Sequence, residues 1–178
     1  MPKQIVLLRG INLGARNRIA MPKLREALSG AGFGEAQTYL QSGNVVLSSK
    51  AAPERVARKC ERLIEDRFGL EIAAVVRTRD ELAEVVRRNP LGDVAKNPKR
   101  YQVSFLAAKP TREVVKKLEA AVVAPEQFAA IGREIYAWHP EGVARSRLWA
   151  LLAGKDLGVK ATARNWTTVT KLLALADE

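Results

Sequence analysis

Strand-length apolar runs alternate with helical apolar stripes through the first 76 residues, and their order constrains the fold more than any other feature. Apolar runs predict strands over residues 4–9, 38–40, 45–47 and 72–76. Helical spacing of apolar residues predicts helices over about residues 21–31 and 53–67. The turn Gln41–Asn44 joins the two middle strands as a hairpin. The predicted order is therefore strand, helix, strand, strand, helix, strand.

That order is the ferredoxin-like βαββαβ pattern, and the second half of the chain repeats part of it. After a helix over about residues 80–88 and a linker at Leu91–Arg100, the pattern predicts a strand, a helix that Thr111 caps, a hairpin around Gly132, and a helix from Ser146. A last helix is predicted from Trp166 to Leu175. We expect an α+β protein of duplicated ferredoxin-like units, with the second copy incomplete and followed by a C-terminal helix. The expected domains are residues 1–78 and 79–178, packed closely together.

Length and composition exclude a membrane-spanning protein. The chain has 178 residues, of which 47% are hydrophobic, but no apolar run reaches the roughly 20 residues of a membrane span. The N-terminus enters a strand pattern directly, without the features of a secretory signal. A single cysteine cannot form an internal disulfide. We therefore expect a cytoplasmic protein with no membrane partner.

The net charge of +11 is spread along the chain. Residues 1–78 contain 13 Lys and Arg against 7 Asp and Glu, and residues 79–178 contain 17 against 12. A basic excess of this kind favours nucleic acid or another polyanion as a partner. The alternative is a basic surface that only reflects an arginine-rich proteome, since charge alone bears on solubility and non-specific binding.

The loop that follows the first strand has the composition of an anion site. It contains Arg9, Gly10, Asn12, Gly14 and Arg16. Glycine frees the backbone so that N–H groups can point at a ligand, and the arginines add positive charge beside them. The alternative is that Asn12 only caps its own loop.

The hairpin turn Gln41, Ser42, Gly43 and Asn44 is expected beside this loop. In a βαββαβ sheet the first and third strands are neighbours, so the end of the first strand meets the turn that precedes the third. The polar turn residues could therefore orient a ligand. The alternative is structural, because Gly and Asn tolerate the positive φ that tight hairpins require.

A third segment, Arg164, Asn165 and Trp166, precedes the last predicted helix. Thr162 or Asn165 can cap that helix, whose first N–H groups favour an anion. Trp166 lies on the apolar stripe of the same helix, so it can equally belong to the core.

Three motifs together resemble a known family. They are LLRGINLG at residues 7–14, TYLQSGNVV at 38–46 and TARNWTTVTKL at 162–172. In these motifs the chain resembles the bacterial family called domain of unknown function 1697, from the first strand to the last helix. Ala15, Ala163 and Thr167 depart from the residues that the family often has. The resemblance implies a fold related to ferredoxin-like units and a cytoplasmic location, and it implies no established activity.

No catalytic residue can be named from the sequence. His139 is the only histidine, so neither a His-rich metal site nor a Ser-His-Asp triad is expected. Cys60 lies on an apolar helical stripe and is interpreted as structural. There is no Walker loop or dinucleotide fingerprint, and we predict no metal and no cofactor.

The leading functional hypothesis is binding of an anionic, phosphate-bearing ligand: a nucleotide, a phosphorylated metabolite or RNA. The site would be one rim formed by the three segments, with Arg164 contributed by the second half. One alternative is an enzyme of unknown reaction that uses the same rim. Another is a protein-interaction or oligomerisation module. The oligomeric state is left open.

Overall fold

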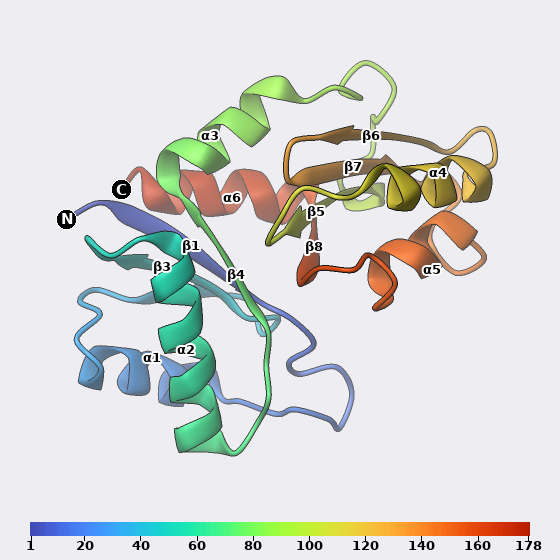
Figure 1. Ribbon diagram of the computed structural model, residues 1–178. Coiled ribbons are helices and arrows are strands. Elements are labelled where there is room, and N and C mark those ends of the chain that lie inside the picture. Colours follow the sequence, from blue (N-terminus) through green and yellow to red (C-terminus); the bar gives the residue numbers. More distant parts are fainter. The chain divides into compact units, whose positions relative to one another are not determined.

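The computed structural model describes residues 1–178 and contains two four-stranded antiparallel sheets (Figure 1). The first sheet has the strand order β2-β3-β1-β4, and the second has the matching order β6-β7-β5-β8. The strands of the first sheet are β1 (Lys3–Leu8), β2 (Gln37–Tyr39), β3 (Asn44–Ser48) and β4 (Ala74–Thr78). Those of the second are β5 (Tyr101–Leu106), β6 (Gln127–Ile131), β7 (Glu134–Trp138) and β8 (Ala161–Asn165).

The chain also forms six α-helices and one 3₁₀ helix. They are α1 (Met21–Gly30), α2 (Pro53–Phe68), α3 (Arg79–Arg88), η1 (Pro98–Arg100), α4 (Arg112–Ala121), α5 (Arg147–Ala153) and α6 (Trp166–Ala176). Each sheet is thus built from a βαββαβ sequence of elements, β1 to β4 with α1 and α2, and β5 to β8 with α4 and α5. The predicted α+β fold of duplicated ferredoxin-like units is confirmed.

One detail differs from the prediction, because the second copy has all four strands. Residues 161–165, which the sequence analysis left as the approach to the last helix, form β8 and pair antiparallel with β5. The segment is short and carries only small or polar side chains, so its periodicity is weak. Strand formation there depends on pairing with β5, which is a tertiary effect.

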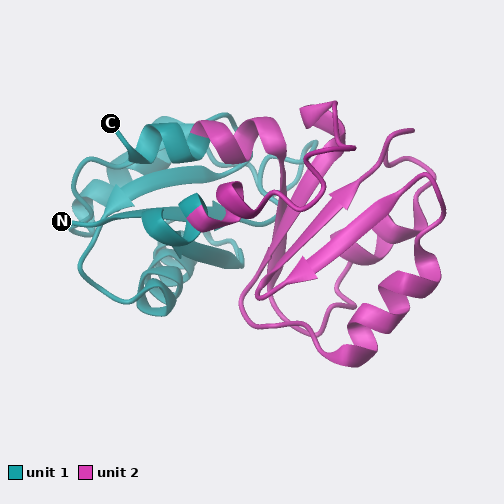
Figure 2. Cartoon of the chain, turned by 90° about the horizontal axis from the view of Figure 1, so that it is seen from above, with its two compact units in different colours: residues 1–83, 172–178 teal, residues 84–171 magenta.

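The chain forms two compact units, which Figure 2 colours separately. Unit 1 comprises residues 1–83 and 172–178, and unit 2 comprises residues 84–171. The domain boundary expected between residues 78 and 79 stays a prediction.

In unit 1, α1 and α2 cover one face of the first sheet (Figure 1). Both helices begin with a proline in the first turn, where the missing N–H removes no helical hydrogen bond. α2 ends at Gly69, which adopts a φ of 66° and donates its N–H to Glu65 O. The core on this face contains Leu24 and Leu28 of α1, Val56, Cys60 and Ile64 of α2, and Val6, Leu8, Val45, Leu47 and Val76 of the sheet.

In unit 2, α4 and α5 cover one face of the second sheet (Figure 1). Thr111 accepts a hydrogen bond from Val114 N at the start of α4, and Ser146 accepts one from Trp149 N at the start of α5. Both caps agree with the helix starts expected from the sequence. The core on this face includes Val114, Leu118, Leu148, Leu152, Leu106, Ile135 and Ala137. None of the helices is long and apolar enough to cross a membrane.

Cys60 is buried in the core of unit 1, as its helical spacing predicts. Burial, with a smaller contribution from Glu61, raises the pKa of its thiol from 9.0 to about 12. We expect a bulky thiol reagent to react slowly with the folded protein, since the thiolate is the reactive form. We also expect Cys60→Ala to lower the free energy of unfolding by about 1 kcal/mol.

The raised pKa also predicts a pH dependence. The folded state favours the neutral thiol. The contribution of Cys60 to the free energy of unfolding is therefore complete below the unfolded pKa near 9 and is lost as pH rises toward 12. Urea unfolding between pH 8 and 11 should therefore show a steeper alkaline loss of stability for the natural protein than for Cys60→Ala. Two results would contradict a buried structural thiol. One is a loss of stability with pH that is the same in the natural protein and in Cys60→Ala, and the other is thiol labelling of the folded protein as fast as in urea.

Candidate functional site

The loop after β1 and the turn before β3 lie side by side in unit 1. Leu8 N donates to Gly43 O at 2.9 Å, and Asn12 Nδ2 donates to Gln41 O at 2.6 Å. β1 and β3 are hydrogen-bonded neighbours, so the end of one strand reaches the turn that precedes the other. Two of the three segments singled out in the sequence are therefore adjacent.

Within this loop, the asparagines are engaged by the loop's own backbone. Asn12 has a φ of 54°, and its side chain accepts from Ile19 N at 2.9 Å and donates to Ile19 O at 3.0 Å. Asn17 Nδ2 donates to Gly10 O at 3.1 Å. The Asn12 side chain therefore holds the loop closed, which is the capping role that the sequence left open.

Gly43 and Asn44 have clear structural roles in the turn. Gly43 has a φ of 84°, and a Cβ built on it would lie 2.7 Å from Leu8 Cβ. Asn44 is fully buried, and its Nδ2 donates to Tyr39 O and to Ser42 Oγ, both at 2.9 Å. The turn chemistry therefore explains these two residues without a ligand.

The rest of the loop and turn is more accessible. Arg16, Gly14, Gln41 and Ser42 are exposed, while Arg9 and Gly10 are half-buried. Arg9 N donates to Ala73 O at 2.9 Å, which fixes the backbone where β1 ends. Arg16 and Gln41 are the exposed side chains of this region that no loop-closing hydrogen bond involves.

The third predicted segment belongs to unit 2, where Arg164 lies on β8. Its guanidinium is buried and donates from Nη1 to Thr162 Oγ1 at 2.7 Å and to Ala163 O at 2.8 Å. Burial lowers the pKa of Arg164 from 12.5 to about 10, so the side chain remains charged at neutral pH. Sequence reasoning placed this arginine before a helix, whereas the structure places it within a strand.

Asn165 and Trp166 have local roles at the start of α6. Asn165 Oδ1 accepts from Thr168 N at 2.9 Å, so Asn165 is the cap of this helix, one of the two caps considered from the sequence. Trp166 stacks on Tyr101 with ring centroids 4.9 Å apart and lies 6.5 Å from Tyr136. The tryptophan belongs to an aromatic cluster of unit 2. That this segment completes one rim with the loop and turn of unit 1 stays a prediction.

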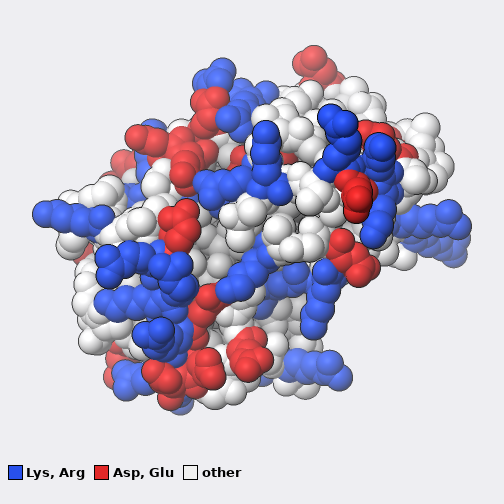
Figure 3. All heavy atoms as spheres, viewed as in Figure 1, with Lys and Arg blue, Asp and Glu red and all other residues white.

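The structure shows a basic cavity that the sequence analysis did not single out. It has a volume of about 580 Å³ and is called the α2 cavity below. Its lining is Phe33, Ser49, Ala51, Arg55, Val56, Arg58, Lys59 and Arg62. In Figure 3, Lys and Arg side chains gather over the part of the surface that α2 forms.

Four cations and no carboxylate line the α2 cavity. No ion pair is formed by Arg55, Arg58 or Arg62, all three exposed. Lys59 Nζ donates to Ala31 O at 2.7 Å and lies 4.7 Å above the ring of Phe33. The helical spacing 55, 58, 59, 62, opposite the buried stripe 56, 60, 64, is a signal that could have identified this face.

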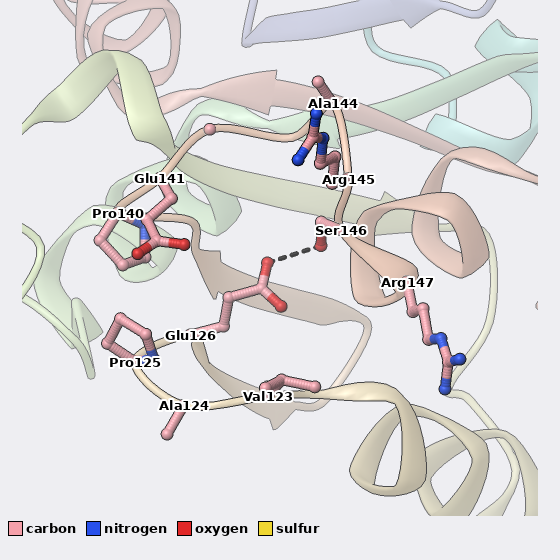
Figure 4. Close-up of a pocket in the computed structure, with 11 residues that line it drawn as sticks. Val123, Ala124, Pro125, Glu126, Pro140, Glu141, Ala144, Arg145, Ser146 and Arg147 are labelled. Carbon is pink, nitrogen blue, oxygen red and sulfur yellow. Dashed lines mark hydrogen bonds between the residues drawn. The ribbon is translucent and has the colours of Figure 1, made fainter.

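A second cavity lies wholly within unit 2, between the loop before β6 and the loop before α5 (Figure 4). It has a volume of about 540 Å³ and is called the Glu126 cavity below. Glu126 Oε2 accepts a hydrogen bond from Ser146 Oγ at 2.5 Å and lies 2.7 Å from His139 Nδ1. His139 is fully buried against Trp149, with ring centroids 5.7 Å apart.

This cluster is not a Ser-His-acid triad. Both Ser146 Oγ and Glu126 Oε2 lie at Nδ1 of His139, whereas a triad places the serine and the acid at opposite ring nitrogens. Sequence reasoning missed the cluster because Glu126 precedes β6, whereas His139 and Ser146 lie in the loop between β7 and α5. No group of three or more His, Cys, Asp or Glu side chains is arranged to hold a metal ion.

Comparisons with known proteins give a family and a fold. A family model described as "Protein of unknown function (DUF1697)" matches residues 1–136. No curated protein matches the chain. Among solved structures, the chain is similar to the conserved bacterial protein SP0830 from Streptococcus pneumoniae, with 18% sequence identity, a TM-score of 0.76 and coverage of 98% of each chain. At this identity the similarity shows the fold alone.

Proposed function

Because the chain belongs to the DUF1697 family, whose description gives no function, we propose a function from the geometry: the protein binds a phosphate-bearing ligand in the α2 cavity. The single observation that carries this proposal is a cavity of about 580 Å³ lined by four cations and no carboxylate. Cavities of this size accommodate small molecules.

The charges on α2 favour an anion on physical grounds. Among these cations, the pairs 55/58, 55/59, 58/62 and 59/62 are three or four residues apart, and like charges at this spacing destabilise a helix. No carboxylate of the protein is paired with the three guanidinium groups. A bound phosphate would neutralise this repulsion, and its oxygens would accept hydrogen bonds from the paired N–H groups of a guanidinium.

The α2 cavity differs from the diffuse basic charge of the whole molecule. Surface cations spread over a protein attract any polyanion, and that attraction falls steeply with salt. Cations that converge on one cavity can instead bind a small phosphate compound with defined stoichiometry. We therefore favour a nucleotide or a phosphorylated metabolite over RNA as the ligand of this cavity.

The rim predicted from the sequence is a second candidate site for the same class of ligand. Arg16 and Gln41 support it, because both are exposed and neither side chain is used to close the loop or the turn. The support for this rim is weaker than the support for the α2 cavity. Four of its predicted residues have structural roles of their own: Asn12, Gly43, Asn44 and Asn165.

Calorimetric titration with ATP tests the proposal, at about 150 mM salt so that diffuse charge attraction is screened. We expect one ATP per chain, and at least about a tenfold loss of affinity in the double variant Arg58→Gln/Arg62→Gln. The control is Arg112→Gln/Lys116→Gln, which removes two exposed cations at the same spacing from α4. Its affinity should change by less than about twofold.

Two outcomes would overturn the proposal. One is equal loss of ATP affinity in the two double variants, together with a steep salt dependence. The other is the absence of saturable ATP binding while an RNA oligomer still binds. Either result would leave only non-specific attraction between the basic surface and polyanions.

A further inference from the structure

The Glu126 cavity of unit 2 is separate from the α2 cavity and has a different charge pattern. Its walls are residues 123–126, which precede β6, and residues of the segment 140–147, which precedes α5 (Figure 4). The two loops contribute two carboxylates, Glu126 and Glu141, and two guanidinium groups, Arg145 and Arg147. A cavity with both signs of charge suits a ligand that also carries both.

Glu126 is held in place at one carboxylate oxygen only. Oε2 accepts from Ser146 Oγ at 2.5 Å, and His139 Nδ1 lies 2.7 Å away on the other side. Because a carboxylate can only accept, His139 presents its proton on Nδ1. Nε2 of His139 is buried without a hydrogen-bond partner.

The other oxygen of Glu126 has no donor from the protein. The side chain is 14% exposed, and it lines the cavity. A carboxylate oxygen in such a partly buried position gains most from a cationic donor, since a charged hydrogen bond is stronger than a neutral one. Oε1 is therefore a prepared acceptor for an ammonium group.

Glu141 and Arg145 supply the remaining charges. Both are exposed at the edge of the cavity, and neither forms an ion pair within the protein. Figure 4 shows the Glu126 and Glu141 carboxylates in the space between the two loops, with Arg145 on the same loop as Glu141. A ligand carboxylate could pair with Arg145 while its ammonium lies between the two glutamates.

The apolar part of the lining indicates the rest of the ligand. Val123, Pro125 and Pro140 contribute to the walls, and Val123 is 64% exposed although it is apolar. An apolar side chain packed against Val123 would remove this surface from water. We propose that the Glu126 cavity binds a free amino acid with an apolar side chain, with its ammonium group at Glu126 and Glu141 and its carboxylate at Arg145.

Three compounds test the two charged contacts separately. Calorimetric titration of the full chain uses L-leucine, leucinamide, which lacks the carboxylate, and N-acetyl-L-leucine, which lacks the ammonium group. We expect L-leucine to bind, leucinamide to bind about tenfold more weakly, and N-acetyl-L-leucine not to bind at up to about 10 mM. Binding of N-acetyl-L-leucine as tight as that of L-leucine would overturn the proposal, as would no binding of L-leucine.

The variants keep the test decisive if one of them fails to fold. Glu126→Gln should abolish L-leucine binding, but it also disturbs the contacts to Ser146 and His139. Glu141→Gln and Arg145→Gln alter side chains without partners in the fold, and each should weaken binding by about fivefold or more. Glu119→Gln, on the exposed face of α4, is the matched control and should leave the affinity unchanged. Unchanged affinity in both Glu141→Gln and Arg145→Gln would overturn the assignment.

Discussion

Asn44→Asp is expected to lower the free energy of unfolding of unit 1 by about 3–5 kcal/mol at pH 7. Asn44 is fully buried, and its amide group donates to Tyr39 O and to Ser42 Oγ. An ionised carboxylate at this position has the same shape but cannot donate. It would place a charge against the Tyr39 carbonyl oxygen, out of contact with water.

The loss should shrink as the pH falls. Burial raises the pKa of the introduced carboxyl group above the ordinary value of about 3.9, so its neutral form returns first in the folded state. The neutral acid can donate one hydrogen bond, and the stability deficit is therefore smaller below the folded pKa and complete above it. Urea unfolding followed by circular dichroism at pH 7 and pH 5 measures the difference.

Asn17→Asp is the matched control for this substitution. Asn17 is exposed, and its Nδ2 makes one hydrogen bond to Gly10 O at 3.1 Å. We expect this control to lose less than about 1 kcal/mol, with little pH dependence. Hydrogen exchange of the β1 and β3 amides would locate the loss in unit 1. Similar losses in the two variants would contradict the structural role of Asn44.

Gly43→Ala is expected to lower the free energy of unfolding by about 3 kcal/mol. Two effects add: a φ of 84° is unfavourable for a residue with a Cβ, and that Cβ would lie 2.7 Å from Leu8 Cβ and 2.8 Å from Ile11 Cδ1. Leu8 Cβ is fixed to the strand backbone, so relief would require β1 or the turn to move.

Gly14→Ala separates these two effects. Gly14 also has a positive φ, of 63°, but a Cβ there would meet no heavy atom within 4 Å. Its loss should therefore be about 1–2 kcal/mol, the backbone contribution alone. The difference between the two alanine variants, measured by urea unfolding, reports the steric contact. Equal losses would show that Gly43 is required for its backbone conformation only.

These losses of stability affect the interpretation of binding experiments with variants of the Gln41–Asn44 turn. Substitution of Gly43 or Asn44 would reduce ligand binding through loss of folded protein, even if neither residue touches the ligand. Gln41 and Arg16 are exposed, so substitutions there test the predicted rim with less effect on stability. Comparison of the two kinds of variant distinguishes a ligand site from a structural turn.

Part of the candidate site was predictable from sequence because it depends on strand adjacency. The βαββαβ order makes β1 and β3 neighbours, and this alone brings the loop after β1 to the Gln41–Asn44 turn. It was not predictable from sequence which of those residues stabilise the turn and which remain exposed to a ligand. Whether Asn44 faces a ligand or the backbone of its own turn depends on the burial of its side chain, which the sequence does not state.

The two cavities show the limit of sequence reasoning more clearly. Arg55, Arg58, Lys59 and Arg62 have a visible helical spacing, but the cavity also needs Phe33, Ser49 and Ala51 from other segments. In unit 2, Glu126, His139 and Ser146 meet although 20 residues separate the first from the last. Local sequence patterns carry no information about the distance in space between such groups.

The sequence by itself determined the elements whose signals are local. Apolar spacing set the faces of α1 and α2, glycine and proline marked the turns and helix ends, and topology made β1 and β3 neighbours. The tertiary structure alone decided that residues 161–165 are a strand, because these side chains gain their conformation by pairing with β5. It also decided where charges converge, since side chains from distant segments share a cavity only after the chain has folded.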